Sequence, residues 1–220
     1  MSCEVHDMVL VHRVFRRELG AVPSYVRRVA EGDVRRAAVV ADHLAMMLDV
    51  LHHHHETEDE LLWPRLRARV PAADVELVDA MNAEHDTLAR QIDAIGAALP
   101  RWRTSAAVPD GLRLIEAMDG FLITMGGHLD HEEKRALPLC AALIEQPEWN
   151  ELGVAAMRAM GVDVWLLFVN AMREDASDEE WSEFLAALPP DAVESVNGPG
   201  RDAYLAYLGR LRDGGTAATA

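Results

Sequence analysis

Cysteine, aromatic residues, basic residues and long apolar runs are all scarce in this 220-residue chain. The two cysteines, Cys3 and Cys140, have no CxxC spacing, which argues against a disulfide framework and against a cysteine-based zinc site. There are 21 basic and 37 acidic residues, and the net charge of −16 argues against nucleic acid as a partner. The longest apolar patch, near Val164 to Val169, is far shorter than the roughly 20 residues that cross a bilayer. No secretory signal is visible, so we expect a cytoplasmic protein with no membrane partner.

Helix is the structure that the remaining composition favours. Half of the residues are hydrophobic but only 5% are aromatic, and strong helix formers dominate. Apolar residues recur at helical spacing in four long stretches, which predicts an all-α, up-down four-helix bundle. We expect Pro23 to interrupt the first helix, Asp33 to cap the second and Pro100 to close the third. The four expected helices cover residues 5–19, 34–63, 74–99 and 109–137.

A short pattern occurs twice in the chain. His54, Glu58 and Pro64 are followed 74 residues later by His128, Glu132 and Pro138, with the same internal offsets. A second pair of histidines, His12 and His85, has a separation of 73 residues (85 − 12 = 73). The order of a single histidine followed by HxxxE is therefore repeated, which predicts a duplicated helical hairpin.

These repeated residues have the chemistry and spacing of a metal site. Residues four apart lie on one face of a helix, so each HxxxE presents an imidazole and a carboxylate together. Imidazole suits iron, zinc, copper or nickel, and a carboxylate can bridge two ions. Burying so many polar groups without a metal would cost many kcal/mol unless each were paired. The candidate metal ligands are His12, His54, Glu58, His85, His128 and Glu132.

The other histidines receive different predictions. His52 and His55 also have an acidic residue four positions later, but they align with Gly126 and Leu129 of the second half, so we expect them to be solvated or to support the ligands from outside. His43 lies eleven residues before His54, about 16 Å along a helix, and is too distant to bind the same metal. We expect His6 and His131 at the surface. Asp59 and Glu133, the acids that follow the two candidate glutamates, are placed to orient ligands.

The C-terminal part of the chain contains no histidine and does not share the repeat. We divide the chain into a bundle domain over residues 1–145, a helical extension over 146–213 and a disordered tail over 214–220. Short helices are expected at 151–160, 164–172, 177–188 and 200–212, and Ser177 with Glu180 forms a capping box for the third. The extension is expected to act as an intramolecular cap or as the contact of a homodimer.

Two of these motifs resemble a known family. The sequences HxxxED followed by LLWP, and HxxHEE followed by LP, are similar to the second-helix and fourth-helix signatures of hemerythrin-like proteins with the HHE cation-binding domain. The resemblance covers about residues 5–145. It implies that His12 is the histidine of the first helix, that His54 and Glu58 belong to the second, that His85 belongs to the third, and that His128 and Glu132 belong to the fourth.

The resemblance also implies a cofactor and a class of chemistry. The cofactor would be two non-haem iron ions bridged by carboxylates and by an oxo or hydroxo group, and the partner a small ligand such as O2, H2O2 or NO. Oxygen-carrying members have a further histidine four residues after that of the third helix, where this chain has Ala89, and an HxxxxD on the fourth helix. This difference argues against reversible oxygen carriage and favours peroxide or nitric oxide chemistry. An enzyme and a non-catalytic sensor of iron, oxygen or redox state both fit, whereas iron storage and a structural zinc bundle fit less well.

Overall fold

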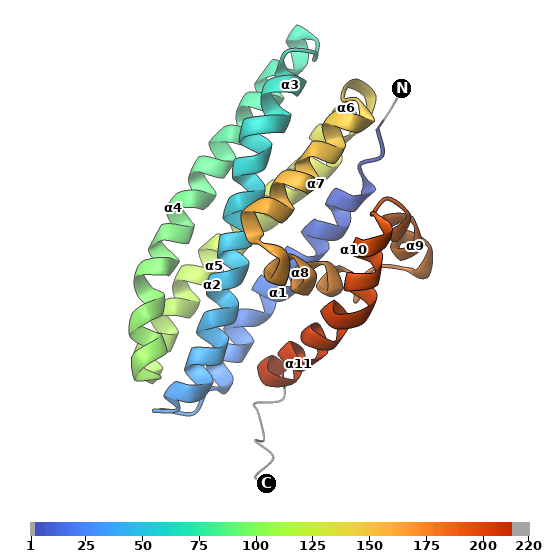
Figure 1. Cartoon of the computed structure of the whole chain (residues 1–220). Coiled ribbons are helices and arrows are strands. Elements are labelled where there is room, and N and C mark those ends of the chain that lie inside the picture. Colours follow the sequence, from blue (N-terminus) through green and yellow to red (C-terminus); the bar gives the residue numbers. More distant parts are fainter. Residues whose placement is uncertain (1–2, 213–220) are drawn as a thin grey trace.

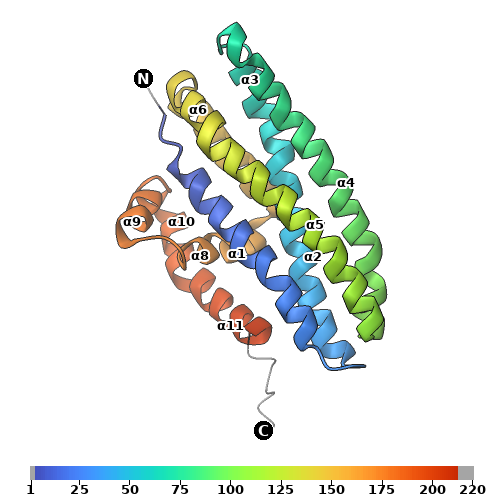
Figure 2. The ribbon, with the colours of Figure 1, turned by 180° about the vertical axis from the view of Figure 1, so that it is seen from behind.

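Four long helices form the bundle that positions the candidate ligands. The computed structural model describes residues 3–212, which contain no β-strand, so the prediction of an all-α bundle is confirmed. Figure 1 shows the long helices side by side, and Figure 2 shows the same arrangement from behind. The bundle is built from α1 (His6–Arg28), α2 (Val34–Thr57), α4 (Val75–Ser105) and α5 (Val108–His131). As predicted, the Asp33 side chain caps α2 by accepting a hydrogen bond from the Arg36 backbone N–H.

Two prolines that were expected to end helices lie inside them. Helix α1 continues through Pro23 to Arg28, and α4 continues through Pro100 to Ser105, so both predictions were wrong. A proline inside a helix removes one backbone hydrogen bond and costs about 3 kcal/mol. Packing offsets this cost, because Val26 in α1 and Trp102 in α4 lie beyond the prolines and are buried in the core.

A π-helical turn follows the HxxxE motif in each half of the bundle. The turn η1 (Glu58–Leu62) leads into α3 (Trp63–Arg67), and η3 (Glu132–Ala136) leads into α6 (Leu137–Leu143). Each π turn begins at the candidate glutamate and ends two residues before the repeated proline. The wider turn lets the helical course continue past Pro64 and Pro138, where the sequence predicted an end. A short 3-10 helix, η2 (Ala72–Asp74), then leads into α4.

The candidate ligands form a polar layer that divides the hydrophobic core in two. Phe15, Leu51 and Leu88 belong to one buried apolar cluster, and Leu62 and Met81 belong to the other. On α1, α2, α4 and α5 the candidate ligand histidines occupy the helical turn between these clusters. The polar layer is therefore shielded by apolar side chains at both ends.

The C-terminal helices pack against one side of the bundle. They are α7 (Gln146–Met160), α8 (Val162–Met172), α9 (Asp178–Ala186), α10 (Pro190–Ser195), η4 (Val196–Gly200) and α11 (Arg201–Arg212). Helix α8 contacts α1, while α7 and α11 contact α2 (Figure 1). The predicted capping box at Ser177 is present, whereas α10 and η4 were not predicted. The tail expected over 214–220 lies outside the described residues. None of the described helices has the length and apolar character that crossing a membrane requires.

Candidate metal centre

Two groups of ligand-type side chains meet inside the bundle. In each group, one nitrogen or oxygen atom from every member lies within 4.8 Å of those of the others. The first group contains His12, His54, Glu58 and Glu132, and the second contains His55, His85 and His128. All six residues singled out in the sequence are thus brought together, from α1, α2, η1, α4, α5 and η3, and His55 joins them.

The two glutamates connect the two groups. Glu58 Oε1 lies 3.3 Å from His54 Nε2, and Glu58 Oε2 lies 3.5 Å from His85 Nε2. Glu132 Oε2 lies 3.4 Å from His12 Nε2 and 3.8 Å from His128 Nε2. Each carboxylate therefore faces one histidine of each group, Glu58 with its two oxygens and Glu132 with Oε2 alone.

A second set of carboxylates holds the imidazole rings from outside. Asp59 accepts a hydrogen bond from His85 Nδ1 at 2.7 Å, and Glu133 accepts one from His12 Nδ1 at 2.9 Å. The two contacts are equivalent in the sequence repeat. Asp59 of the first hairpin holds His85 of the second, and Glu133 of the second hairpin holds His12 of the first. These hydrogen bonds fix the orientation of the two rings, as expected for Asp59 and Glu133.

Glu84 is a third orienting acid, which the sequence analysis missed. It accepts a hydrogen bond from His128 Nδ1 at 2.9 Å and another from His131 Nδ1 at 2.8 Å. Glu84 precedes His85 in the chain, but it contacts histidines of a different helix. No signal local to the sequence indicates this pairing.

The inner atoms of these residues lack hydrogen-bond partners. Three rings, those of His12, His85 and His128, donate their Nδ1 proton outward to a carboxylate. The Nε2 atom of such a ring then carries a lone pair that points inward. His85 Nε2 and His128 Nε2 lie only 3.2 Å apart, although neither then has a proton to donate. Further buried atoms without a hydrogen-bond partner are His12 Nε2, His54 Nε2, His55 Nε2 and both carboxylate oxygens of Glu58 and of Glu132. Bound cations would satisfy these acceptors together, so the residues fit a metal centre.

Burial holds four of the imidazoles of the centre neutral. It lowers the pKa of His12 and His128, and it places the pKa of His54 and of His55 well below the ordinary value. A neutral imidazole is the form that binds a metal ion. Four of the five histidines in the two groups are therefore poised as ligands at neutral pH.

The carboxyl groups of the centre respond to burial in the opposite direction. Burial, and after it the charge of Glu132, raises the pKa of Glu58 well above its ordinary range. Burial, and after it the charge of Glu133, raises the pKa of Glu132 to about 8. Without cations, the two carboxyl groups therefore hold protons that metal binding would displace.

Of the two alternatives expected for His55, the solvated one was wrong. Its side chain is buried and its ring stacks on that of His85, with the ring centroids 4.1 Å apart. His54 and His55 point toward different helices because successive residues are about 100° apart around a helix, so His54 meets α1 and His55 meets α4. Leu129, the repeat equivalent of His55, is also fully buried, and its apolar side chain is the sequence signal that could have identified the position as internal. His52 is exposed, as expected.

The remaining histidines lie apart from both groups. His43 is buried, and its Nδ1 contacts the Tyr207 hydroxyl while its Nε2 lies 3.6 Å from Glu18. His6 is exposed and pairs with Glu180 at 2.6 Å. His131 is half-buried beside Glu84 rather than at the open surface.

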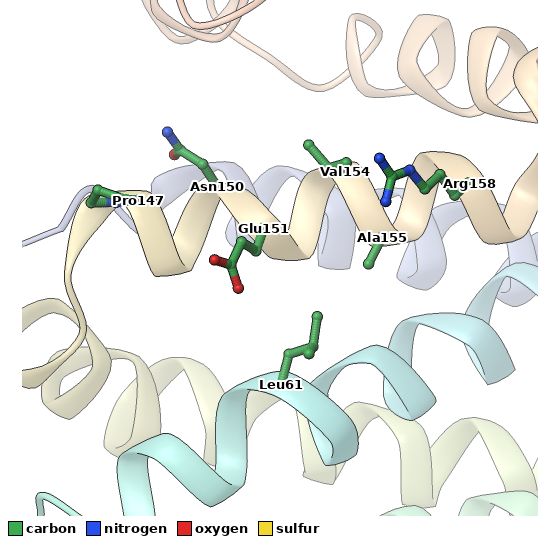
Figure 3. Close-up of a pocket in the computed structure, with 7 residues that line it drawn as sticks. All are labelled: Leu61, Pro147, Asn150, Glu151, Val154, Ala155 and Arg158. Atoms are coloured by element: carbon green, nitrogen blue, oxygen red, sulfur yellow. The ribbon is translucent and has the colours of Figure 1, made fainter.

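A pocket of about 620 Å³ lies between α7 and η1, as Figure 3 shows. Its lining includes one acid, one base and several apolar residues: Leu61, Pro147, Asn150, Glu151, Val154, Ala155 and Arg158. The lining includes no member of either ligand group. We therefore place the chemistry at the buried cluster and regard this pocket as a groove on the surface of α7.

The metal-free protein should lose stability as pH rises from about 7 to about 8. The raised pKa of Glu132 means that the folded state keeps a proton in this range which the unfolded chain, with a pKa of 4.5, has released. Each such proton lowers the free energy of unfolding by up to about 1.4 kcal/mol per pH unit. Below about pH 6.5 the buried histidines, whose pKa values are lowered, act in the opposite direction, because the unfolded chain then binds protons that the folded state does not. Urea unfolding in a chelator at several pH values measures this. A stability that rose steadily between about pH 7 and pH 8 would contradict the assignment.

The comparisons with known proteins address the same part of the chain. A family model described as the hemerythrin HHE cation-binding domain matches residues 3–140, more than half of the chain. A search of curated proteins and a search of solved structures found no match. The family match spans all the residues of both ligand groups.

Proposed function

The chain belongs to the hemerythrin HHE cation-binding family, and on that premise we propose that it is a non-haem di-iron protein whose centre reacts with a small oxygen or nitrogen species. Peroxide detoxification is the reaction that we favour among those of O2, H2O2 and NO. The observation that supports the proposal is the set of buried, unpaired acceptor atoms on His12, His54, His55, Glu58 and Glu132. Two bound irons would supply reversible one-electron chemistry and exchangeable positions for a small ligand.

The protein donors are divided unequally between the two groups. The group of His55, His85 and His128 offers three nitrogens, and that of His12 and His54 offers two. If Glu58 and Glu132 each served as a donor to both ions, the counts would be 3 + 2 = 5 and 2 + 2 = 4 donors. The side of His12 and His54 therefore has more room for an external ligand. We propose that His55 takes the place of the imidazole that is missing at Ala89, so reversible oxygen binding is also compatible with this donor set.

The surrounding residues fix this arrangement and limit access of water. Glu133 accepts hydrogen bonds from His12 Nδ1 and, at 2.6 Å, from Arg16 Nη1, so its charge stays paired while it orients the ring. Phe15 packs against His54, with the ring centroids 5.2 Å apart. Apolar clusters cover the polar layer on both sides, so only small molecules fit as substrates.

The experiment that tests the proposal is metal analysis combined with an absorption spectrum of protein purified aerobically after iron-replete expression. We expect about two irons per chain and the near-ultraviolet bands of a coupled ferric pair, which should change when peroxide is added. About one zinc per chain with no iron would contradict the proposal.

His55→Ala should lower the iron content from about two ions per chain toward one, because the group that it joins loses one of three nitrogens. The matched control is His52→Ala, which removes an exposed imidazole from the same histidine run and should leave the iron content unchanged. Iron per chain is measured by elemental analysis after desalting. Equal iron in the His55→Ala variant and the unmodified protein would remove His55 from the ligand set.

A redox or metal sensor is the second candidate function, and one set of contacts favours it. Phe15 touches the candidate ligand His54, and it also touches Phe168 of α8 at a centroid distance of 5.3 Å. A change at the centre could therefore alter how the C-terminal helices pack on the bundle.

Because the two free cysteines suit a reducing compartment, we propose that either function operates in the cytoplasm.

A further inference from the structure

The two cysteines of the chain meet although 137 residues separate them. The Cys3 thiol donates a hydrogen bond to the backbone carbonyl of Cys140 at 3.4 Å, and the Cys3 backbone N–H donates to the Ala141 carbonyl at 3.0 Å. Both thiols are free, and both cysteines are buried in the apolar cluster that covers one side of the polar layer. To form a disulfide, the Cys3 sulfur has to turn from the Cys140 carbonyl to the Cys140 sulfur.

Cys140 lies on the same buried face as the candidate bridging residue Glu132. Glu132, Ala136 and Cys140 are spaced by four residues along η3 and α6, and all three are fully buried. The equivalent position in the first half of the chain is Leu66, also fully buried, so an apolar side chain can fill this place. The thiol is therefore a chemical difference between the two halves, eight residues beyond Glu132 or about 12 Å along a helix.

Neither thiol is suited to direct attack on an oxidant from solution. Burial raises the pKa of both cysteines, and the charges of Glu132 and Glu58 further raise the pKa of Cys140. Protonated, buried thiols react slowly with peroxide in bulk water. Oxidation of this pair would therefore need an oxidising centre close to it inside the protein.

We propose that Cys3 and Cys140 form a redox-active dithiol that supplies two electrons to the neighbouring metal centre during reduction of peroxide. This inference rests on the proposed di-iron function. In the net reaction two thiols and one H2O2 give one disulfide and two waters. The two S–H bonds and the O–O bond break, one S–S bond and two O–H bonds form, sulfur is oxidised, and the peroxide oxygens are reduced. The two thiol protons end in the waters.

The test uses the full-length protein, loaded with ferrous iron or freed of iron with a chelator, and one equivalent of H2O2. After acid quenching and alkylation, free thiols are counted under denaturing conditions, and mass spectrometry identifies linked peptides. We expect the iron-loaded protein to lose both thiols and to yield a peptide pair joined through Cys3 and Cys140. The iron-free protein should keep both. A Cys3→Ser variant, which keeps only one of the two cysteines, should yield no linked peptide and serves as the blank for the mass spectrometry.

The outcomes separate the inference from the function on which it rests. If the absorption spectrum of the loaded protein responds to peroxide while both thiols survive, the dithiol proposal is overturned and the di-iron proposal stands. If no iron binds and the spectrum does not respond, the di-iron proposal itself has failed. Equal thiol loss with and without iron would overturn the coupling, because oxidation would then not pass through the centre. Conversion of either cysteine to a sulfinic acid without a linked peptide would also overturn it.

Discussion

Glu58→Ala is expected to abolish stable iron binding and to lower the melting temperature of the iron-loaded protein by roughly 10 °C. The variant removes a carboxylate that faces His54 in one group and His85 in the other, so both ions lose a donor. A ligand at about a thousand times its Kd stabilises the folded state by about 4 kcal/mol. For a chain of this size, each kcal/mol changes the melting temperature by about 2–4 °C. Calorimetry and metal analysis on the same samples measure both effects.

The matched control for Glu58→Ala is Glu60→Ala, in the same π turn. Glu60 is exposed, and its loss should change neither iron content nor melting temperature by a measurable amount. In chelator, by contrast, Glu58→Ala should be at least as stable as the unmodified protein, because it removes a buried carboxyl group whose oxygens have no hydrogen-bond partner. A Glu58→Ala protein that kept two irons would refute the bridging role.

Deleting residues 146–220 should leave iron binding in place but strongly reduce stability and solubility. Every member of the two ligand groups lies before residue 146, so the metal site should persist. The deletion uncovers the side of α1 and α2 against which α7, α8 and α11 pack, including the contact of Phe15 with Phe168. A newly exposed apolar face promotes association, and the centre should oxidise at a different rate. Light scattering, metal analysis and stopped-flow absorption measure these changes.

Two point variants accompany the deletion. Phe168→Ala should destabilise the full-length protein by about 3–5 kcal/mol because it opens a cavity beside Phe15, with no loss of iron. Val162→Ala, at an exposed position at the start of the same helix, should have little effect on stability. If the shortened chain were as stable and as soluble as the whole protein, the C-terminal helices would be an independent appendage. If it folded but bound no iron, a ligand beyond residue 145 would have been overlooked.

The sequence predicted the bundle and the six repeated residues because both depend on regular spacing. Helical periodicity requires only one chain, and the 74-residue repeat identified which of the clustered histidines matched His128. The prolines misled the prediction because the cost of Pro23 and Pro100 is local, whereas the packing that offsets it comes from the tertiary structure. The π turns at Glu58 and Glu132 were also missed, since nothing in the local pattern distinguishes them from an ordinary helical turn.

The site residues that the sequence did not reveal are recognised only by their contacts between helices. Glu84 orients His128 across the bundle, 44 residues away in the chain, and no periodic pattern encodes that pair. His55 was set aside because its repeat partner is Leu129, which cannot bind metal. The repeat does show that the position is internal, but only the three-dimensional structure places the His55 ring on His85. The contact between Cys3 and Cys140 likewise could not be predicted from the sequence alone.

The central claim is that one centre holds two metal ions bridged by Glu58 and Glu132. The measurement that tests it most directly is a crystal structure of the iron-loaded protein with anomalous scattering recorded at the iron edge. The account predicts two anomalous peaks about 3.5–4 Å apart, both within bonding distance of Glu58 and Glu132, one beside His12 and His54 and the other beside His55, His85 and His128. A single peak, or peaks outside this polar layer, would contradict it.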